Sequence, residues 1–264
     1  MDLFADDDSS QDNDDRDSVN LEPVSNVAQR PSKCGVLSFH QGTEEALLNE
    51  IEQQTSVGDV TSILQIADMF CEKKHWMMLV GPEKGRIVLS ALEQAVHKHE
   101  SIHCLEIGSY VGYGSALIAS ALRQNDTLLT LDIDAQACAW TKRLLVQAGL
   151  EHRVTIRNDN VTSLRDNETF NFVFIDHDKS LYLSDLQIIL PHLASGAVVV
   201  ADNVLCFDNG LSMRNYMDFV RNHTDGPFSR SQLYPASLEY SFGLEPDGLE
   251  VSIFTDDPSS FFNR

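Results

Sequence analysis

Two acidic segments, each at the end of an apolar run, are the residues of this chain best suited to chemistry. Asp176 follows the run Phe172–Ile175, and Asp202 with Asn203 follows the run Ala197–Ala201. The two aspartates lie 26 residues apart, which is about one strand–helix–strand unit. In a parallel sheet such a unit brings both carboxylates to the edge where open α/β sheets bind ligands. Because hard oxygen ligands suit Mg²⁺, the sequence predicts a magnesium site formed by Asp176, Asp202 and Asn203.

A glycine-rich turn follows an earlier predicted strand, with Gly108, Gly112 and Gly114 in the spacing G-x-x-x-G-x-G. This spacing differs from the G-x-G-x-x-G of dinucleotide enzymes. Glycines there allow close approach of a ligand, and the helix N-terminus behind them favours a carboxylate. With Glu106 placed to meet an ammonium and Asp132 to meet ribose hydroxyls, the loop favours S-adenosylmethionine over NAD. Taken alone, the loop also fits a tight corner of any α/β protein.

The elements that must position these residues alternate along the chain, which predicts a parallel sheet with both faces covered. The predicted strands are Ile102–Ile107, Leu128–Ile133, Arg153–Ile156, Asn171–Ile175 and Ala197–Ala201, then Ser231–Tyr234 and Leu249–Phe254. Helices are predicted from Thr43, which is a plausible cap, from Gly58-Asp59, and over Lys84–His99, Tyr113–Leu122, Ala135–Ala148, Leu181–His192 and Met213–Asn222. No repeat or second core is evident, so one domain is predicted over residues 38–256.

The net charge of −21 is unusually acidic for 264 residues, and it argues against nucleic acid or an anionic membrane as a partner. Residues 1–20 alone hold eight aspartates and one arginine. The composition of residues 1–37 predicts a disordered acidic tail, with a docking segment for a basic partner as the alternative. Residues 257–264 are assigned to a short C-terminal tail.

Three further features bear on the compartment. No apolar run approaches the roughly 18 residues of a membrane helix. The acidic N-terminus is the reverse of a signal peptide, and five scattered cysteines without CxxC spacing fit free thiols rather than zinc. We therefore expect a cytoplasmic protein with a small-molecule substrate, and a monomer is the simplest expectation.

Taken together, several short segments resemble the cation-dependent O-methyltransferase family, and within it the catechol O-methyltransferase branch. The resemblance runs from about Gly42 to Phe254. The matching segments are Trp76–Gly81, Lys84-Gly85, Leu105–Tyr113, Asp176–Lys179, Ala201–Val204, Leu238–Tyr240 and Asp247–Glu250. The resemblance implies a Rossmann-like class I S-adenosylmethionine-dependent methyltransferase, with a mostly parallel seven-stranded sheet and a reversed last strand.

The resemblance also implies roles for individual residues. Asp176, Asp202 and Asn203 would hold Mg²⁺, and Lys179 would be the general base. Glu239 would hydrogen-bond the second catechol hydroxyl as the other catalytic residue. The cofactor would contact Val80, Glu106, Gly108, Tyr110, Gly114, Asp132, Val161 and Asp176. The substrate would contact Lys179, Asn203, Glu239, Trp76 and Met78.

The implied reaction is methyl transfer from a sulfonium to a phenolate-like oxygen, for which Mg²⁺ would lower the pKa of the hydroxyl. Simpler interpretations stay open for four features: a turn at Asp202-Asn203, a surface lysine at Lys179, a rim carboxylate at Glu239, and core packing at Trp76.

The chain departs from the family pattern where an aromatic gatekeeper is usual, because Asp178 stands there. Leu79 and Gly114 replace an asparagine and a serine, although Ser115 can compensate for the latter, and Phe207 is a candidate for the missing aromatic wall. Two alternatives to a catechol enzyme follow. One is an O-methyltransferase of a larger phenolic, such as a secondary metabolite or a CoA ester, and the other is a catalytically silent binding protein.

Overall fold

The computed structural model describes residues 42–206, 208–241 and 243–255. The predicted tails at residues 1–37 and 257–264 and the candidate wall Phe207 lie outside these residues. Among those described, the chain from Gly42 onward forms one compact unit.

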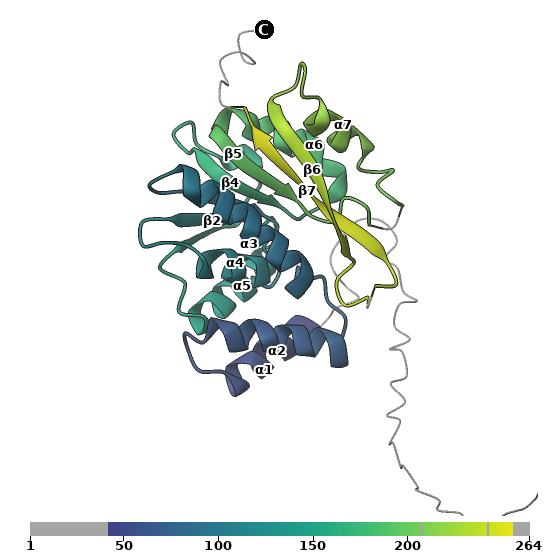
Figure 1. The fold of residues 1–264 in the computed structure, drawn as a ribbon. Helices are drawn as coiled ribbons and strands as arrows, with labels where there is room; N and C mark the ends of the chain where they lie inside the picture. Colours follow the sequence, from purple (N-terminus) through teal and green to yellow (C-terminus); the bar gives the residue numbers. More distant parts are fainter. Residues whose placement is uncertain (1–41, 207, 242, 256–264) are drawn as a thin grey trace, which may run out of the picture. The chain divides into compact units, whose positions relative to one another are not determined.

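A seven-stranded sheet runs through this unit in the order β3-β2-β1-β4-β5-β7-β6 (Figure 1). Its strands are β1 (His103–Ile107), β2 (Thr127–Leu131), β3 (Val154–Arg157), β4 (Phe170–Ile175), β5 (Leu193–Ala201), β6 (Phe228–Ser237) and β7 (Pro246–Phe254). Strand β7 is antiparallel to both neighbours, and the pairs from β3 to β5 are parallel. The mostly parallel sheet with a reversed last strand is thereby confirmed.

Helices cover both faces of the sheet. They are α1 (Thr43–Gln54), α2 (Val60–Lys73), α3 (Gly81–Lys98), α4 (Tyr113–Ser120), α5 (Ala135–Gln147), α6 (Tyr182–Ile189) and α7 (Arg214–Arg221). Apolar residues of α1 to α5 form one core with one face of the sheet, while α6 and α7 form a second core with the other face. Consecutive strand residues alternate between the cores: Phe172 and Phe174 face the first, Val173 and Ile175 the second. This alternation follows from the period-two geometry of a strand.

Several predicted boundaries were wrong by a few residues, each for a local reason. Helix α3 begins at Gly81 because Pro82 fits a first turn, whose N–H groups have no intrahelical acceptor. Thr43 is the first residue of α1 and not its cap, which is Gly42. The helix predicted over Leu181–His192 is α6 flanked by two 3₁₀ turns, Lys179–Leu181 and Leu190–His192.

Candidate active site

The sequence-predicted residues meet at the carboxyl ends of β1, β4 and β5. The chain order reverses between β1 and β4, which are adjacent although β2 and β3 separate them in sequence. The backbone N–H of Asp176 donates to the Ile107 carbonyl at 2.9 Å, and that of Asp202 donates to the Ile175 carbonyl at 3.0 Å. Both aspartates therefore follow directly from paired strands, at the switch point where α/β sheets bind ligands.

Gly108 allows the β1 loop to lie against the β4 loop. Its φ of +94° is left-handed, and a Cβ at this position would overlap the backbone carbonyl oxygen of Asp176. Only glycine can adopt this left-handed φ and leave room for the Asp176 carbonyl without a large loss of stability.

We expect Gly108→Ala to destabilise the protein by about 3 kcal/mol or more, because left-handed strain and a backbone clash add together. Gly58→Ala is the matched control, since Gly58 has a similar φ of +89° and nothing within 4 Å of the added Cβ. That control is expected to cost only about 1–2 kcal/mol. Urea unfolding of the two variants tests this, and equal losses would contradict the close approach.

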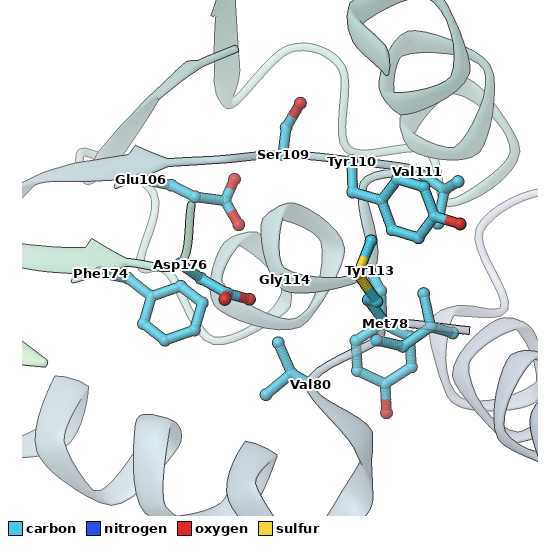
Figure 2. A pocket seen from close by; sticks show the side chains of 11 residues that line it. Met78, Val80, Glu106, Ser109, Tyr110, Val111, Tyr113, Gly114, Phe174 and Asp176 are labelled. Atoms are coloured by element: carbon cyan, nitrogen blue, oxygen red, sulfur yellow. The ribbon is translucent and has the colours of Figure 1, made fainter. Parts of the chain in front are cut away.

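A pocket opens beside the glycine loop (Figure 2). Five of the eight predicted cofactor residues line it: Val80, Glu106, Tyr110, Gly114 and Asp176. Figure 2 shows the carboxylates of Glu106 and Asp176 directed toward the helix start at Gly114. Met78, which was predicted to contact the substrate, also lines this pocket.

Glu106 is fully buried at the base of the pocket. Its Oε2 accepts hydrogen bonds from the hydroxyls of Ser115 and Thr130, the latter at 2.7 Å. Burial raises the pKa of Glu106 to about 7, against the opposing effect of the two hydroxyls. A buried carboxylate that titrates near neutrality is suited to receive a cationic group.

Gly114 leaves the room that this carboxylate uses. A Cβ on Gly114 would lie 2.5 Å from Glu106 Oε1. Ser115 bonds Glu106 directly, so it places a hydroxyl beside the site where the family pattern has a serine one residue earlier.

The other three predicted cofactor residues lie outside the pocket lining. Asp132 Oδ2 accepts from the backbone N–H groups of Ser109 and Tyr110 at 2.9 and 3.0 Å, so this carboxylate holds the glycine loop in shape. Val161 is buried in the second core. Gly108 acts through the loop contact described above.

A polar cluster surrounds Lys179 at the end of β4. Its Nζ donates to Asp176 Oδ1 at 3.3 Å, to Asn203 Oδ1 at 3.0 Å, and to the Tyr182 hydroxyl at 3.0 Å. The Tyr182 hydroxyl donates in turn to the Asp202 carbonyl at 3.1 Å. The predicted base and the predicted metal ligands are thus brought together, and Lys179 is not an isolated surface lysine.

A second cluster, formed around Lys84 of α3, was missed by the sequence analysis. Lys84 Nζ lies 2.9 Å from Asp202 Oδ1 and 2.5 Å from Asp247 Oδ2, and it also donates to Glu239 Oε1. All four side chains are buried. The available signal was the helix pattern: Lys84 lies on the same stripe as Val88, Ala91, Leu92 and Ala95, where a lysine is unexpected.

The Lys84 ammonium therefore contacts three buried carboxylates. Without the lysine, these three carboxylates would be close enough together to hold a metal ion. Although burial alone would lower the pKa of Lys84, its three anionic partners raise it well above the usual value. Burial raises the pKa of Asp202 and Glu239, because Lys84 offsets their desolvation only in part. The raised pKa values mean that one ammonium only partly stabilises the charged forms of these carboxyls, so a further cation at this edge would favour their ionisation.

Asp202 keeps one oxygen without a partner among the described residues. Its Oδ1 accepts from Lys84 and from the Asn203 backbone N–H at 2.7 Å, whereas its Oδ2 is buried and makes no hydrogen bond. Such an atom costs free energy unless a ligand or cation meets it.

The remaining predicted substrate residues adjoin this cluster. Trp76 Nε1 donates to the Glu239 carbonyl at 2.8 Å, so Trp76 supports the turn that carries Glu239.

Asp178 is exposed and caps the following 3₁₀ turn, accepting from the Ser180 N–H at 2.9 Å and the Ser180 hydroxyl at 2.8 Å. The position of the family's aromatic gatekeeper is therefore occupied by a helix-capping carboxylate.

Comparisons with known proteins agree with this geometry. Residues 53–218 match the model of the O-methyltransferase family. Catechol O-methyltransferase B of Danio rerio is 32% identical over 80% of this chain and 78% of its own length. Catechol O-methyltransferase of Mus musculus is 30% identical over 82% of this chain and 80% of its own length.

Solved structures share the fold. The O-methyltransferase from Bacillus cereus in complex with SAH has a TM-score of 0.58 at 18% identity, covering 83% of this chain and 97% of that one. TomG from Streptomyces achromogenes, in complex with SAM, has a TM-score of 0.58 at 20% identity, covering 80% of this chain and 96% of that one. Within the residues that the structure describes, no helix has the length and apolar character to cross a membrane.

Proposed function

Given that this chain belongs to the O-methyltransferase family, we propose that it methylates one hydroxyl of a catechol in a Mg²⁺-dependent reaction. S-adenosylmethionine is the methyl donor of this enzyme class. The observation that carries the finer proposal is the buried, unpartnered Oδ2 of Asp202, beside Asp176 and Asn203 at one sheet edge.

These residues fit a magnesium ion by the chemistry of their donors. Asp176, Asp202 and Asn203 offer two carboxylates and an amide oxygen, and a cation there would favour the ionised form of Asp202, whose pKa is raised to about 8 by burial. When bound there, Mg²⁺ supplies a Lewis acid that lowers the pKa of an aromatic hydroxyl. The three carboxylates around Lys84 are a poorer metal site, because an ammonium already lies among them.

Lys179 is the proposed general base. Its Nζ contacts Asp176 and Asn203, so as a neutral amine it would be placed to accept the proton of an acceptor hydroxyl bound at this sheet edge. Glu239 is proposed to accept a hydrogen bond from the second hydroxyl, and Trp76 fixes the turn that presents it. Alignment of the acceptor oxygen with the methyl group would supply much of the acceleration.

The cofactor is proposed to lie in the pocket of Figure 2. Glu106 would receive the ammonium of the methionine moiety, while Val80, Met78 and Tyr110 would pack along the cofactor. Asp132 would contact the ribose from the end of β2, and Gly108 and Gly114 would leave room for the approach. Val161 would support the adenine end from the core.

The affinity for S-adenosylmethionine is expected to fall about tenfold when the pH is lowered from about 7 to about 5.5. The pKa of Glu106 is about 7, so acidification neutralises the carboxylate that should meet the ammonium, while the ammonium itself stays charged. Calorimetry at the two pH values measures this. Glu106→Gln should bind more weakly at both, without the pH dependence, and an unchanged wild-type affinity would contradict the assignment.

A larger phenolic is the second candidate acceptor. Asp178 is exposed and folded back onto Ser180, so it supplies no aromatic wall on that side of the acceptor. An aspartate at this position restricts an acceptor ring less than a packed aromatic side chain would, which favours acceptors larger than simple catechol.

Acceptor comparison tests the proposal. Labelled S-adenosylmethionine is supplied with catechol, with its monomethyl ether, and with a large catechol ester. We expect transfer to both compounds that keep vicinal hydroxyls and none to the ether, which cannot offer two hydroxyls. Equal transfer to the ether, or none to any catechol, would contradict the proposed substrate class.

A further inference from the structure

We propose that Lys84 is a positioning residue that orients the Asn203 amide and the Glu239 carboxylate for the reaction at the sheet edge. This inference rests on the proposed function, because it concerns how the chain prepares its metal and acceptor sites. Lys84 is not one of the residues that line the pocket, and its ammonium contacts Asp202, Glu239 and Asp247, through which we infer that it acts.

Asn203 shares its acceptors with Lys84. Its Nδ2 donates to Asp247 Oδ2 at 2.7 Å and to Glu239 Oε1 at 3.1 Å, the same two oxygens that Lys84 contacts. An amide that donates on one side must present its oxygen on the other. Asn203 Oδ1 is therefore turned toward Asp176 and Lys179, where a metal ligand is needed.

The backbone of Asn203 supports the same orientation. Its φ of +54° is left-handed, a conformation that asparagine adopts more readily than most other non-glycine residues. The Asp202 carboxylate accepts the Asn203 N–H at 2.7 Å, and Lys84 holds the same Oδ1 at 2.9 Å. Lys84 thus fixes the residues on both sides of the Asn203 side chain.

Lys84 itself is rigidly placed. It lies in the first turns of α3, where Pro82 restricts the backbone. The helix also packs closely against α4 at this point, because a Cβ added to Gly85 would lie only 3.1 Å from Leu117 Cδ2. Its side chain is about 1% exposed, so it cannot exchange its partners for water. Because Lys84 contacts Asp202 after β5, Glu239 in the turn before β7 and Asp247 in β7, it holds these three segments in fixed positions relative to one another.

A double-mutant cycle on Mg²⁺ affinity separates positioning from charge. Lys84→Met is made in the wild-type protein and in the Asn203→Ala protein, and Mg²⁺ binding is measured by calorimetry with S-adenosylhomocysteine present. The loss of one positive charge acts on Mg²⁺ in both backgrounds. The orientation of the Asn203 amide can matter only in the wild-type background. The change in the Kd for Mg²⁺ that Lys84→Met causes should therefore be about fivefold or more larger in the wild-type background than in the Asn203→Ala background.

Equal changes in both backgrounds would overturn the positioning role. Lys74→Met is the matched control, since Lys74 pairs with Glu50 at 2.5 Å on the surface and should change Kd in neither background. If Lys84→Met does not fold, Asp247→Asn enters the same cycle, because it keeps the lysine and removes the charge that Asn203 faces. Equal changes there would also overturn the proposal.

Turnover gives a second readout. In the folded Lys84→Met protein, kcat for catechol is expected to fall about tenfold at saturating Mg²⁺, with S-adenosylmethionine affinity unchanged within about twofold. A wild-type protein that does not bind Mg²⁺ would refute the metal site of the proposed function, and this inference with it. Mg²⁺ binding with no coupling between Lys84 and Asn203 would refute this inference alone.

Discussion

Asp202→Ala is expected to lower the rate of methyl transfer by at least about 10³-fold. The substitution removes the buried Oδ2 that lacks a partner and the Oδ1 that holds both Lys84 and the Asn203 backbone. A metal ion contributes several kcal/mol to the stabilisation of negative charge on oxygen in the transition state. Losing about 4 kcal/mol of this stabilisation corresponds to a rate about 10³-fold lower. The measurement is kcat with labelled S-adenosylmethionine, together with Mg²⁺ affinity by calorimetry.

Asp218→Ala is the control for that experiment, because Asp218 is an exposed residue on α7. It should retain wild-type turnover. An Asp202→Ala protein that keeps Mg²⁺ affinity and turnover would remove Asp202 from the metal site.

Lys179→Met is expected to lower kcat about 10²- to 10³-fold while Mg²⁺ and S-adenosylmethionine still bind. Its Nζ contacts Asp176 and Asn203, and its loss removes the proposed proton acceptor but none of the proposed metal ligands, so Mg²⁺ binding should not weaken. The two variants should therefore differ: Asp202→Ala loses metal and rate, whereas Lys179→Met loses rate alone.

Lys142→Met on α5 is the matched control, since Lys142 is exposed and distant in sequence from the clusters. Wild-type kcat in Lys179→Met would reduce Lys179 to a structural ion-pair partner of Asp176.

The sheet and its switch point could be predicted from the sequence, because buried strands and polar strand ends are strong local patterns. Asp176, Asp202 and Lys179 follow strand ends, and the topology necessarily brings those ends together. The family resemblance added the reversed strand β7, which local patterns alone do not indicate.

The Lys84 cluster could not be predicted in the same way. A lysine is usually solvated, and its burial depends on carboxylates that lie more than a hundred residues later in the chain. The structure places Lys84 among the buried residues of α3, and only the tertiary structure shows that Asp202, Glu239 and Asp247 meet it.

Some residues have two competing uses. The ribose contact of Asp132 stays a prediction, and in the structure its Oδ2 accepts backbone N–H groups of the glycine loop. Asp178 occupies a position typical of an aromatic wall, yet aspartate is also a good cap, and here it caps a 3₁₀ turn. Residue type alone does not decide between such uses.

The central claim is that the carboxylate edge formed by Asp176 and Asp202 makes methyl transfer depend on Mg²⁺. The most direct measurement is transfer from labelled S-adenosylmethionine to catechol, first with Mg²⁺, then with EDTA, then with Mg²⁺ restored. We predict turnover that EDTA abolishes and added Mg²⁺ recovers. Turnover that continues unchanged in EDTA would contradict the claim.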